Sequence, residues 1–330
     1  MVSSARGVIP ILLASLLWGT TGTAAHFLPN TVSPLAIGAA TMAIGGGLLF
    51  ALSARGALRV IRDRSLRRPV VAGVSGIFVY PLAFYTSMHL AGVAIGAVVS
   101  LASAPVFAAV IEFLVDRRGI TRRWTACTAV ALVGTVLLVG GRPSGTDAAA
   151  SAAPVGVLLG LLAGLSYAVY ADASHRVIAA GHGSSATMGA LFGLGAVFLL
   201  PVLALTGAAL LRTAGSVAVT AYLAIGPMFL AYLLFGAGLR TVRGSTATTI
   251  TLVEPLAATI LAILVVGERL DPVGWTGLGL VMVGVSVLVT SGRINQGGRG
   301  KKQPPLIQSG HARAQADGAG RPRTTRNAGR

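Results

Sequence analysis

Long apolar runs separated by short polar stretches occupy residues 7–291 of this 330-residue chain. A hydrocarbon core about 30 Å thick requires roughly 20 apolar residues in a helix, and the runs have about this length. Ten spans are predicted, at residues 7–27, 33–53, 69–89, 93–115, 123–141, 154–174, 185–206, 216–238, 244–266 and 273–291. Strands open to lipid would leave backbone groups unpaired, so the pattern predicts an all-α integral membrane protein with ten transmembrane helices.

The composition supports this interpretation. Only 11% of the residues are charged and 54% are hydrophobic, whereas a soluble domain carries about 25% charged residues. The single cysteine, Cys127, excludes a disulfide framework and a thiolate metal cluster. The sequence has no HExxH motif, no nucleotide-binding GxxxxGK(S/T) loop and no spaced Cys/His pattern. We therefore expect no cofactor, no metal and no enzyme activity, and an ATP-driven pump within this chain is disfavoured.

Basic residues are distributed unequally between the spans. With a cytoplasmic N-terminus, fourteen Lys/Arg that precede the tail fall on the cytoplasmic side, and only Arg142, Arg212 and Arg269 fall outside. Because basic loops are retained in the cytoplasm, the sequence predicts a multi-pass protein of the cell membrane with both termini cytoplasmic.

Residues 292–330 have a different character, with nine Lys/Arg, one acid (Asp317) and few large apolar residues. Such a segment cannot bury enough surface to fold, so we expect a disordered basic cytoplasmic tail. Anionic headgroups of the lipid bilayer are its expected partner. Nucleic acid is disfavoured as a partner, because no aromatic residue is interleaved with the basic ones.

The chain also repeats itself. The segment GVIPILLASLLWG at Gly7 is similar to GVLLGLLAGLSYA at Gly156, and APVFAAVIEFLVDRRGITRRW, ending at Trp124, is similar to EPLAATILAILVVGERLDPVGW, ending at Trp275. Each half holds five spans, and this odd number predicts inverted repeats with a site between them at the membrane midplane. The predicted domains are a first repeat at 1–141, an external linker at 142–153, a second repeat at 154–291 and the tail at 292–330.

Two five-span halves that carry LLWGTTG early and EPLAATILAILVVGERL late resemble the EamA-type transporters of the drug/metabolite transporter superfamily. The resemblance covers residues 7–291. It implies a ten-helix inverted-repeat fold that exports amino acids and other small metabolites, or moves sugar derivatives. Two positions depart from the family pattern: Thr41 stands where many members have Arg, and Arg117 stands in the first half at the place of Glu268.

Aromatic and hydroxyl side chains at mid-depth suggest a small-molecule cavity. Trp18 lies too deep in its span for an interfacial aromatic belt, and its repeat partner is Tyr167. Aromatic walls with a few polar groups are typical of small-molecule sites, although core packing alone would also explain these residues. The predicted substrate-binding residues are Trp18, Thr21, Tyr80, Tyr85, Tyr167, Tyr170, Thr251 and Glu254.

Glu254 and Pro255 interrupt the apolar ninth span, in the stretch TLVEPLAATI. A carboxylate near the midplane costs about 2.5–3.5 kcal/mol even on lenient scales, so Glu254 should face the bundle interior or water. It is predicted to contact the substrate or carry a proton, and helix packing is the alternative. Pro255 cannot donate to the carbonyl of Thr251, which predicts a free carbonyl there. Pro105 occupies the matching position in the first half, and both prolines are predicted hinges.

These features favour a secondary transporter that exports a small polar metabolite, such as an amino acid, by alternating access. A flippase for lipid-linked molecules or sugar derivatives and an intramembrane enzyme remain as alternatives. The expected partners are a small-molecule substrate and the lipid bilayer. The sequence leaves open whether protons are coupled to transport and whether glycine-rich helix faces form a homodimer.

Overall fold

The computed structural model describes residues 2–116, 147–239, 251 and 253–297, with a few positions between 122 and 137. The chain divides into two units, Met1–Ser291 and Gly292–Arg330, and the fold described below is that of the first. The predicted tail lies outside the described residues from residue 298 onward.

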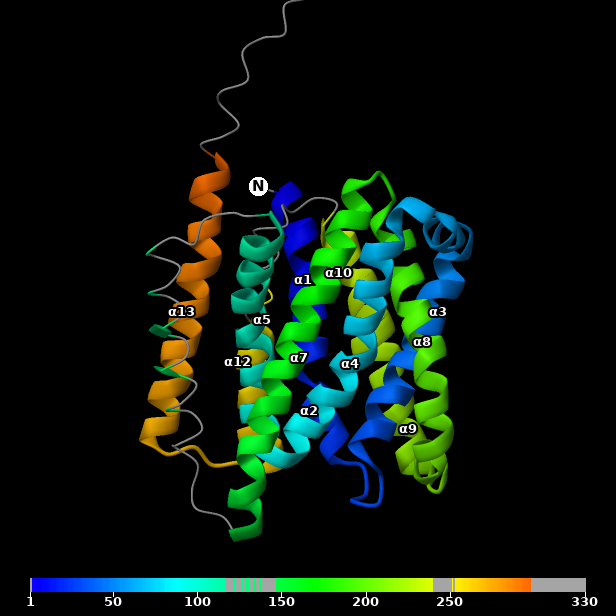
Figure 1. Ribbon diagram of the computed structural model, residues 1–330. Coiled ribbons are helices and arrows are strands. Elements are labelled where there is room, and N and C mark those ends of the chain that lie inside the picture. Colours follow the sequence, from blue (N-terminus) through cyan, green and yellow to red (C-terminus); the bar gives the residue numbers. More distant parts are fainter. Residues whose placement is uncertain are drawn as a thin grey trace, which may run out of the picture. The chain divides into compact units, whose positions relative to one another are not determined.

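Helices make up the regular structure of the described residues (Figure 1). In the first half these are α1 (Val2–Gly19), α2 (Thr21–His26), α3 (Pro34–Arg62), η1 (Arg64–Leu66), α4 (Arg67–Ala91) and α5 (Val93–Asp116). In the second half they are α7 (Asp147–Ala179), α8 (Ser184–Thr206), η2 (Gly207–Leu211), α9 (Ala214–Leu223), η3 (Ala224–Leu230), α10 (Ala231–Leu239), α12 (Val253–Leu261), η4 (Ala262–Val266) and α13 (Pro272–Gly297).

Seven of the described helical segments are long and apolar enough to cross a membrane. They are Val8–His26, Pro34–Arg62, Arg64–Ala91, Val93–Val115, Ala152–Ala179, Ser184–Leu211 and Ala214–Phe235. Each overlaps a predicted span, so the prediction of an all-helical multi-pass protein is confirmed for the described residues. The span predicted at 123–141 falls mostly outside the described residues. The last two predicted spans correspond to the shorter apolar helices Leu256–Val266 and Pro272–Gly284. Ten spans and their inverted arrangement therefore stay predictions.

Local sequence explains where α3 begins and bends. Ser33 accepts a hydrogen bond from the N–H of Leu35 at 3.2 Å, and Pro34 occupies the first turn, where its missing N–H costs nothing. The backbone leaves helical geometry at Ser53, with φ −119° and ψ 20°. The predicted apolar span ends at this same residue, so the bend marks the passage from the apolar segment to the basic end of the helix.

The two predicted repeats pack into each other. The helix α3 packs along α8 and α4 packs along α7, as Figure 1 shows, while α1 contacts α10 and α12. Each of these pairs joins the first half to the second. Large apolar side chains remain on the outside, such as Leu205, Leu211 and Leu264, which are 87%, 78% and 76% exposed. Such a surface suits contact with lipid rather than with water.

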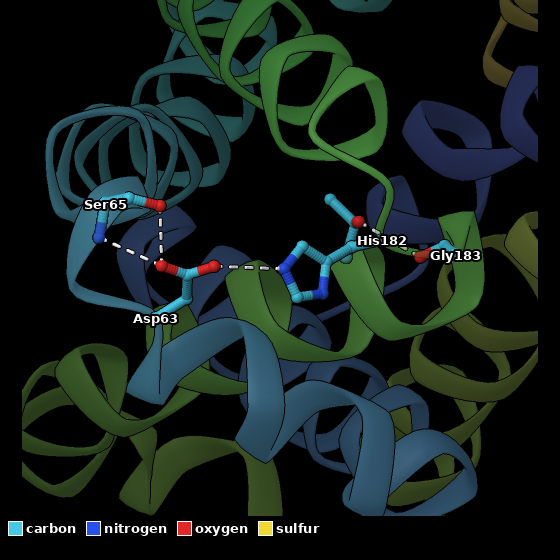
Figure 2. A network of polar contacts seen from close by, with 5 residues as sticks. Asp63, Ser65, His182 and Gly183 are labelled. Carbon is cyan, nitrogen blue, oxygen red and sulfur yellow. Dashed lines mark hydrogen bonds and ion pairs between the residues drawn. The ribbon is translucent and has the colours of Figure 1, made fainter. Parts of the chain in front are cut away.

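A polar network ties two turns together (Figure 2). The Asp63 carboxylate, just after α3, accepts hydrogen bonds from the hydroxyl and the backbone N–H of Ser65 at 2.6 and 2.9 Å. It also lies 3.4 Å from Nε2 of His182, between α7 and α8. The hydrogen bonds from Ser65, and then the contact with His182, lower the pKa of Asp63 because they stabilise its charged form. One carboxylate therefore connects the α3–α4 turn to the α7–α8 turn.

Candidate functional site

A cavity of about 60 Å³ lies inside the bundle, bounded by helices from both halves of the chain. Its lining consists of Trp18, Thr21, Thr41, Met42, Tyr80, Pro81, Phe84, Tyr85, Tyr167, Pro227, Met228, Tyr232 and Glu254. We call this the central cavity. It has room for a few water molecules but is smaller than the roughly 300–1,000 Å³ typical of small-molecule sites. A metabolite would therefore enter only if the surrounding helices or rings moved.

Six of the thirteen described lining residues are aromatic. Trp18 on α1 packs on Tyr232 of α10 with ring centroids 5.2 Å apart. Tyr80 on α4 packs on Tyr167 of α7 at 5.8 Å. Such distances are those of favourable edge-to-face pairs, so the rings hold one another in place. Each pair joins a ring from the first half to a ring from the second, which makes the wall a contact surface between the halves.

Glu254 is the only acidic residue among the described lining residues. It lies in the first turn of α12, because the helix begins at Val253. The first N–H groups of a helix have no partners within it and carry a partial positive charge, which favours a carboxylate there. Pro255 falls in the same turn, where a missing N–H breaks no helical hydrogen bond. The adjacent Glu and Pro are thus explained as the residues of a helix start.

The expected free carbonyl of Thr251 is not observed, and that prediction was wrong. The backbone N–H of Glu254 donates to the Thr251 carbonyl oxygen at 2.9 Å. A turn with an i to i+3 hydrogen bond replaces the bond that Pro255 cannot make.

The first predicted span contains a one-residue turn, at Thr20, beside the cavity. The helix α1 ends at Gly19 and α2 begins at Thr21. Thr20 Oγ1 donates to the carbonyl of Leu17 at 2.7 Å and lies 2.7 Å from the hydroxyl of Tyr222. A methyl group on Gly19 would lie 2.8 Å from Cβ of Ala257 and 3.1 Å from the carbonyl oxygen of Glu254. The absence of a side chain at Gly19 is what lets α1 approach the start of α12.

A π-helical segment also contributes to the wall of the central cavity. The segment η3 (Ala224–Leu230) separates α9 from α10 and carries Pro227 and Met228 to the cavity. π-helical turns are rare and occur frequently at functional sites. The predicted span 216–238 is therefore not one regular helix, and its irregular turn coincides with the cavity wall.

A second cavity, of about 330 Å³, adjoins the first. Its lining includes His26, Asn30, His89 and Glu268, and it shares Tyr85 with the central cavity. Tyr85 is 5% exposed, and its hydroxyl makes no hydrogen bond of ordinary geometry within the described residues. This single side chain therefore forms part of the partition between the two cavities.

Glu268 connects the two halves at the rim of the second cavity. Its carboxylate accepts hydrogen bonds from the backbone N–H of Val93 and, at 3.0 Å, from that of Ala94. These are the first N–H groups of α5, so the negative charge lies where the helix dipole favours it. The contact holds the segment that follows η4 against the start of α5.

Six of the predicted binding residues line the central cavity, namely Trp18, Thr21, Tyr80, Tyr85, Tyr167 and Glu254. Tyr170 lies behind the wall, with its ring 4.9 Å from that of Tyr167 and its hydroxyl 3.1 Å from that of Tyr232. Thr251 is not part of the lining. Pro105 lies within α5 and Pro255 within α12, but their side chains are outside the described ones, so the hinge assignment stays a prediction.

Several lining residues were missed from the sequence. Tyr232 could have been found, because it is an aromatic residue within the predicted span 216–238, although it lies nearer the end of its span than Trp18 does. Thr41 gave no signal beyond its departure from the family pattern, and its hydroxyl donates to the carbonyl of Ile37 at 2.7 Å. No group of three or more His, Cys, Asp or Glu side chains in the described part of the chain is placed to hold a metal ion.

The fold is that of a polytopic membrane protein with a cavity between its helices. Residues 5–140 and 154–290 match the model of the EamA-like transporter family, and the chain belongs to that family. The two matches also cover the two halves in which the sequence repeats itself.

Curated relatives agree with this assignment. The chain is 32% identical over 286 residues to the uncharacterized transporter YwfM of Bacillus subtilis, covering 86% of this chain and 93% of YwfM. It is 23% identical to the uncharacterized inner membrane transporter YicL of Salmonella typhimurium, covering 89% of this chain and 98% of YicL. A solved crystal structure matches with a TM-score of 0.61 and 20% identity, over 88% of this chain and 99% of the other, which shows the fold alone.

Proposed function

We propose that this protein is a secondary transporter of the cell membrane that exports a small polar metabolite by alternating access. The observation that carries the proposal is the central cavity, in which a carboxylate lies among aromatic rings contributed by both halves. A site at the junction of two halves can change its accessibility when the halves move relative to each other.

The second cavity supports a route to and from this site. It adjoins the central cavity at Tyr85 and is several times larger. Movement of the Tyr85 ring would join the two volumes into one path. The opposite end of the central cavity would have to open in another conformation for the substrate to cross. The distribution of basic residues suggests that the second cavity faces outward, because the ends of the predicted spans that line it are poor in Lys and Arg.

Glu254 is the residue on which transport should depend. Glu254→Gln keeps the shape and removes the negative charge, so we expect the variant to insert and fold but to lose transport or its pH dependence. The measurement is uptake and efflux of amino acids and other metabolites in reconstituted vesicles, with and without a proton gradient. Asp271→Asn is the matched control, because Asp271 lies outside the cavity and accepts a hydrogen bond from the N–H of Gly274 that Asn can also accept. If transport and its pH response are unchanged in Glu254→Gln, Glu254 serves only helix packing and the proposed role in transport is wrong.

A further inference from the structure

We propose that the substrate of the central cavity is a small organic cation: an ammonium group on an apolar or aromatic body, without a carboxylate of its own. This inference rests on the proposed function and narrows it. The feature that carries it is the combination of one carboxylate with several aromatic side chains around one volume.

The aromatic wall is suited to a positive charge. Aromatic rings attract a cation placed over their faces within about 6 Å of the ring centroid, and the attraction is strongest for Trp and for desolvated sites. Trp18, Tyr80 and Tyr232 all line the cavity, and each touches a further ring at 4.9–5.8 Å. A cation that entered would lie among several aromatic rings. An anion in the same place would meet the faces of these rings unfavourably.

Glu254 provides the acidic side chain with which such a cation would pair. A carboxylate in a low-dielectric interior attracts an ammonium group much more strongly than it would in water. Its place in the first turn of α12 keeps the carboxylate fixed at the wall without a cationic side chain beside it in the described lining. An incoming ammonium group is thus the partner that this carboxylate lacks among those residues.

The lining also discriminates against zwitterions and anions. No Lys, Arg or His stands among the described residues that line the cavity. The carboxylate of an amino acid would therefore enter without a cationic side chain to receive it there, and it would lie near Glu254. Burying an unpaired charge costs far more than burying an apolar group. An amine with the same apolar part but no carboxylate avoids the free-energy cost of burying an unpaired negative charge.

A matched set of small probes tests the inference on the purified full-length protein in detergent. The probes are 2-phenylethylamine as the cation, phenylalanine as the zwitterion with the same body, 3-phenylpropionate as the anion and 2-phenylethanol as the neutral body. Dissociation constants are measured by calorimetry at pH 7 for the wild type, Glu254→Gln and Asp271→Asn. Because the comparison among probes uses the wild type, it does not depend on whether any variant folds.

We expect 2-phenylethylamine to bind at least about tenfold more tightly than phenylalanine or 3-phenylpropionate, as the loss of one buried charge pair implies. Glu254→Gln should abolish this preference while 2-phenylethanol binds equally to both proteins, and Asp271→Asn should keep the preference. Binding of phenylalanine or 3-phenylpropionate as tight as that of the amine, no binding of the amine, or an unchanged preference in Glu254→Gln would each overturn the inference.

A transport assay separates this inference from the proposed function. Vesicles are tested with labelled phenylalanine and with the permanently charged trimethyl derivative of 2-phenylethylamine, which cannot cross the lipid unaided. If phenylalanine is transported and the cation is not, the proposed transport function stands and the proposed cationic substrate is wrong. If the amine binds but neither compound is transported, the proposed cation-binding site stands and the proposed transport function is wrong.

Discussion

At the scale of single residues, two acidic side chains of this protein lie in very different surroundings. The central cavity holds one carboxylate among aromatic rings, whereas Asp63 lies in a turn outside the spans and is bound by Ser65 and His182. The Asp63 carboxylate accepts hydrogen bonds from Ser65 at the start of a turn, whereas Glu254 lies in the first turn of α12. Of these two acids only Glu254 lines the central cavity, so we propose a functional role for Glu254 and a structural role for Asp63.

The Asp63 network predicts a specific dependence of stability on pH. A carboxylate whose pKa is lowered on folding contributes stability above the pKa of the unfolded chain, about 4, and loses it as the pH falls through the lower folded value. Between about pH 5 and pH 3, the melting temperature of the wild type in detergent should therefore fall more steeply than that of Asp63→Asn. Ser65→Ala removes the hydroxyl that lowers this pKa most, and it should also flatten the curve. Superimposable curves for all three proteins would show that Asp63 contributes nothing.

Some of the residues near the cavity can be recognised from the sequence and others cannot, for physical reasons. Trp18, Tyr167 and Glu254 stand out in any hydrophobic segment, because aromatic and charged groups at mid-depth are costly or unusual. Thr41 does not stand out, because a threonine bonded to its own helix is unremarkable in sequence and only the rotation of α3 brings it to the cavity. The free Thr251 carbonyl was a wrong expectation because it assumed a regular helix through residues where the structure has a turn.

At the scale of elements, the irregular segments gather around the cavity. The break between α1 and α2, the π-helical segment η3 and the start of α12 all border it or lie next to it. A regular span satisfies its backbone internally, so each irregularity needs support from neighbouring helices. The lengths of the spans could be predicted from hydropathy, but these interruptions could not, because they depend on contacts between helices that are distant in sequence.

The approach of α1 to α12 makes Gly19 sensitive to substitution. Gly19→Ala would place a methyl group 2.8 Å from Cβ of Ala257, so the two helices would have to separate by a few tenths of an ångström. Overpacking of this kind costs about 1–3 kcal/mol, and we expect a melting temperature lower by several degrees in detergent. Gly47→Ala is the control, because a methyl group at Gly47 meets nothing within 4 Å. Equal melting temperatures for the two variants would contradict the close approach.

At the scale of the whole molecule, the two halves form one interleaved unit. The pairs α3 with α8 and α4 with α7 place each half against the other over long lengths. The matching segments in the sequence predicted a duplication, and the family match covers both halves. Periodicity and spacing cannot predict which helices pair across the two halves, because that depends on the shapes of the packed faces.

Orientation in the membrane belongs to this same scale. The unequal distribution of Lys and Arg predicts that the segment 55–68, which contains the turn between α3 and α4, is cytoplasmic and the segment 142–153 is external. In a Cys127→Ser background, a membrane-impermeant maleimide should label Ser144→Cys in intact cells. It should label Arg68→Cys only after permeabilisation. Labelling of Arg68→Cys in intact cells would reverse the assignment.

The contact of Glu268 with the start of α5 bears on the ancestry of the chain. A duplicated gene begins with two interchangeable copies, but here the acid belongs to the second copy and the helix end that it binds belongs to the first. The matching position of the first copy is Arg117, so two first copies joined together would lack this acid. Recombination between the copies would remove the contact, so the contact requires that the two copies stay different and in a fixed order.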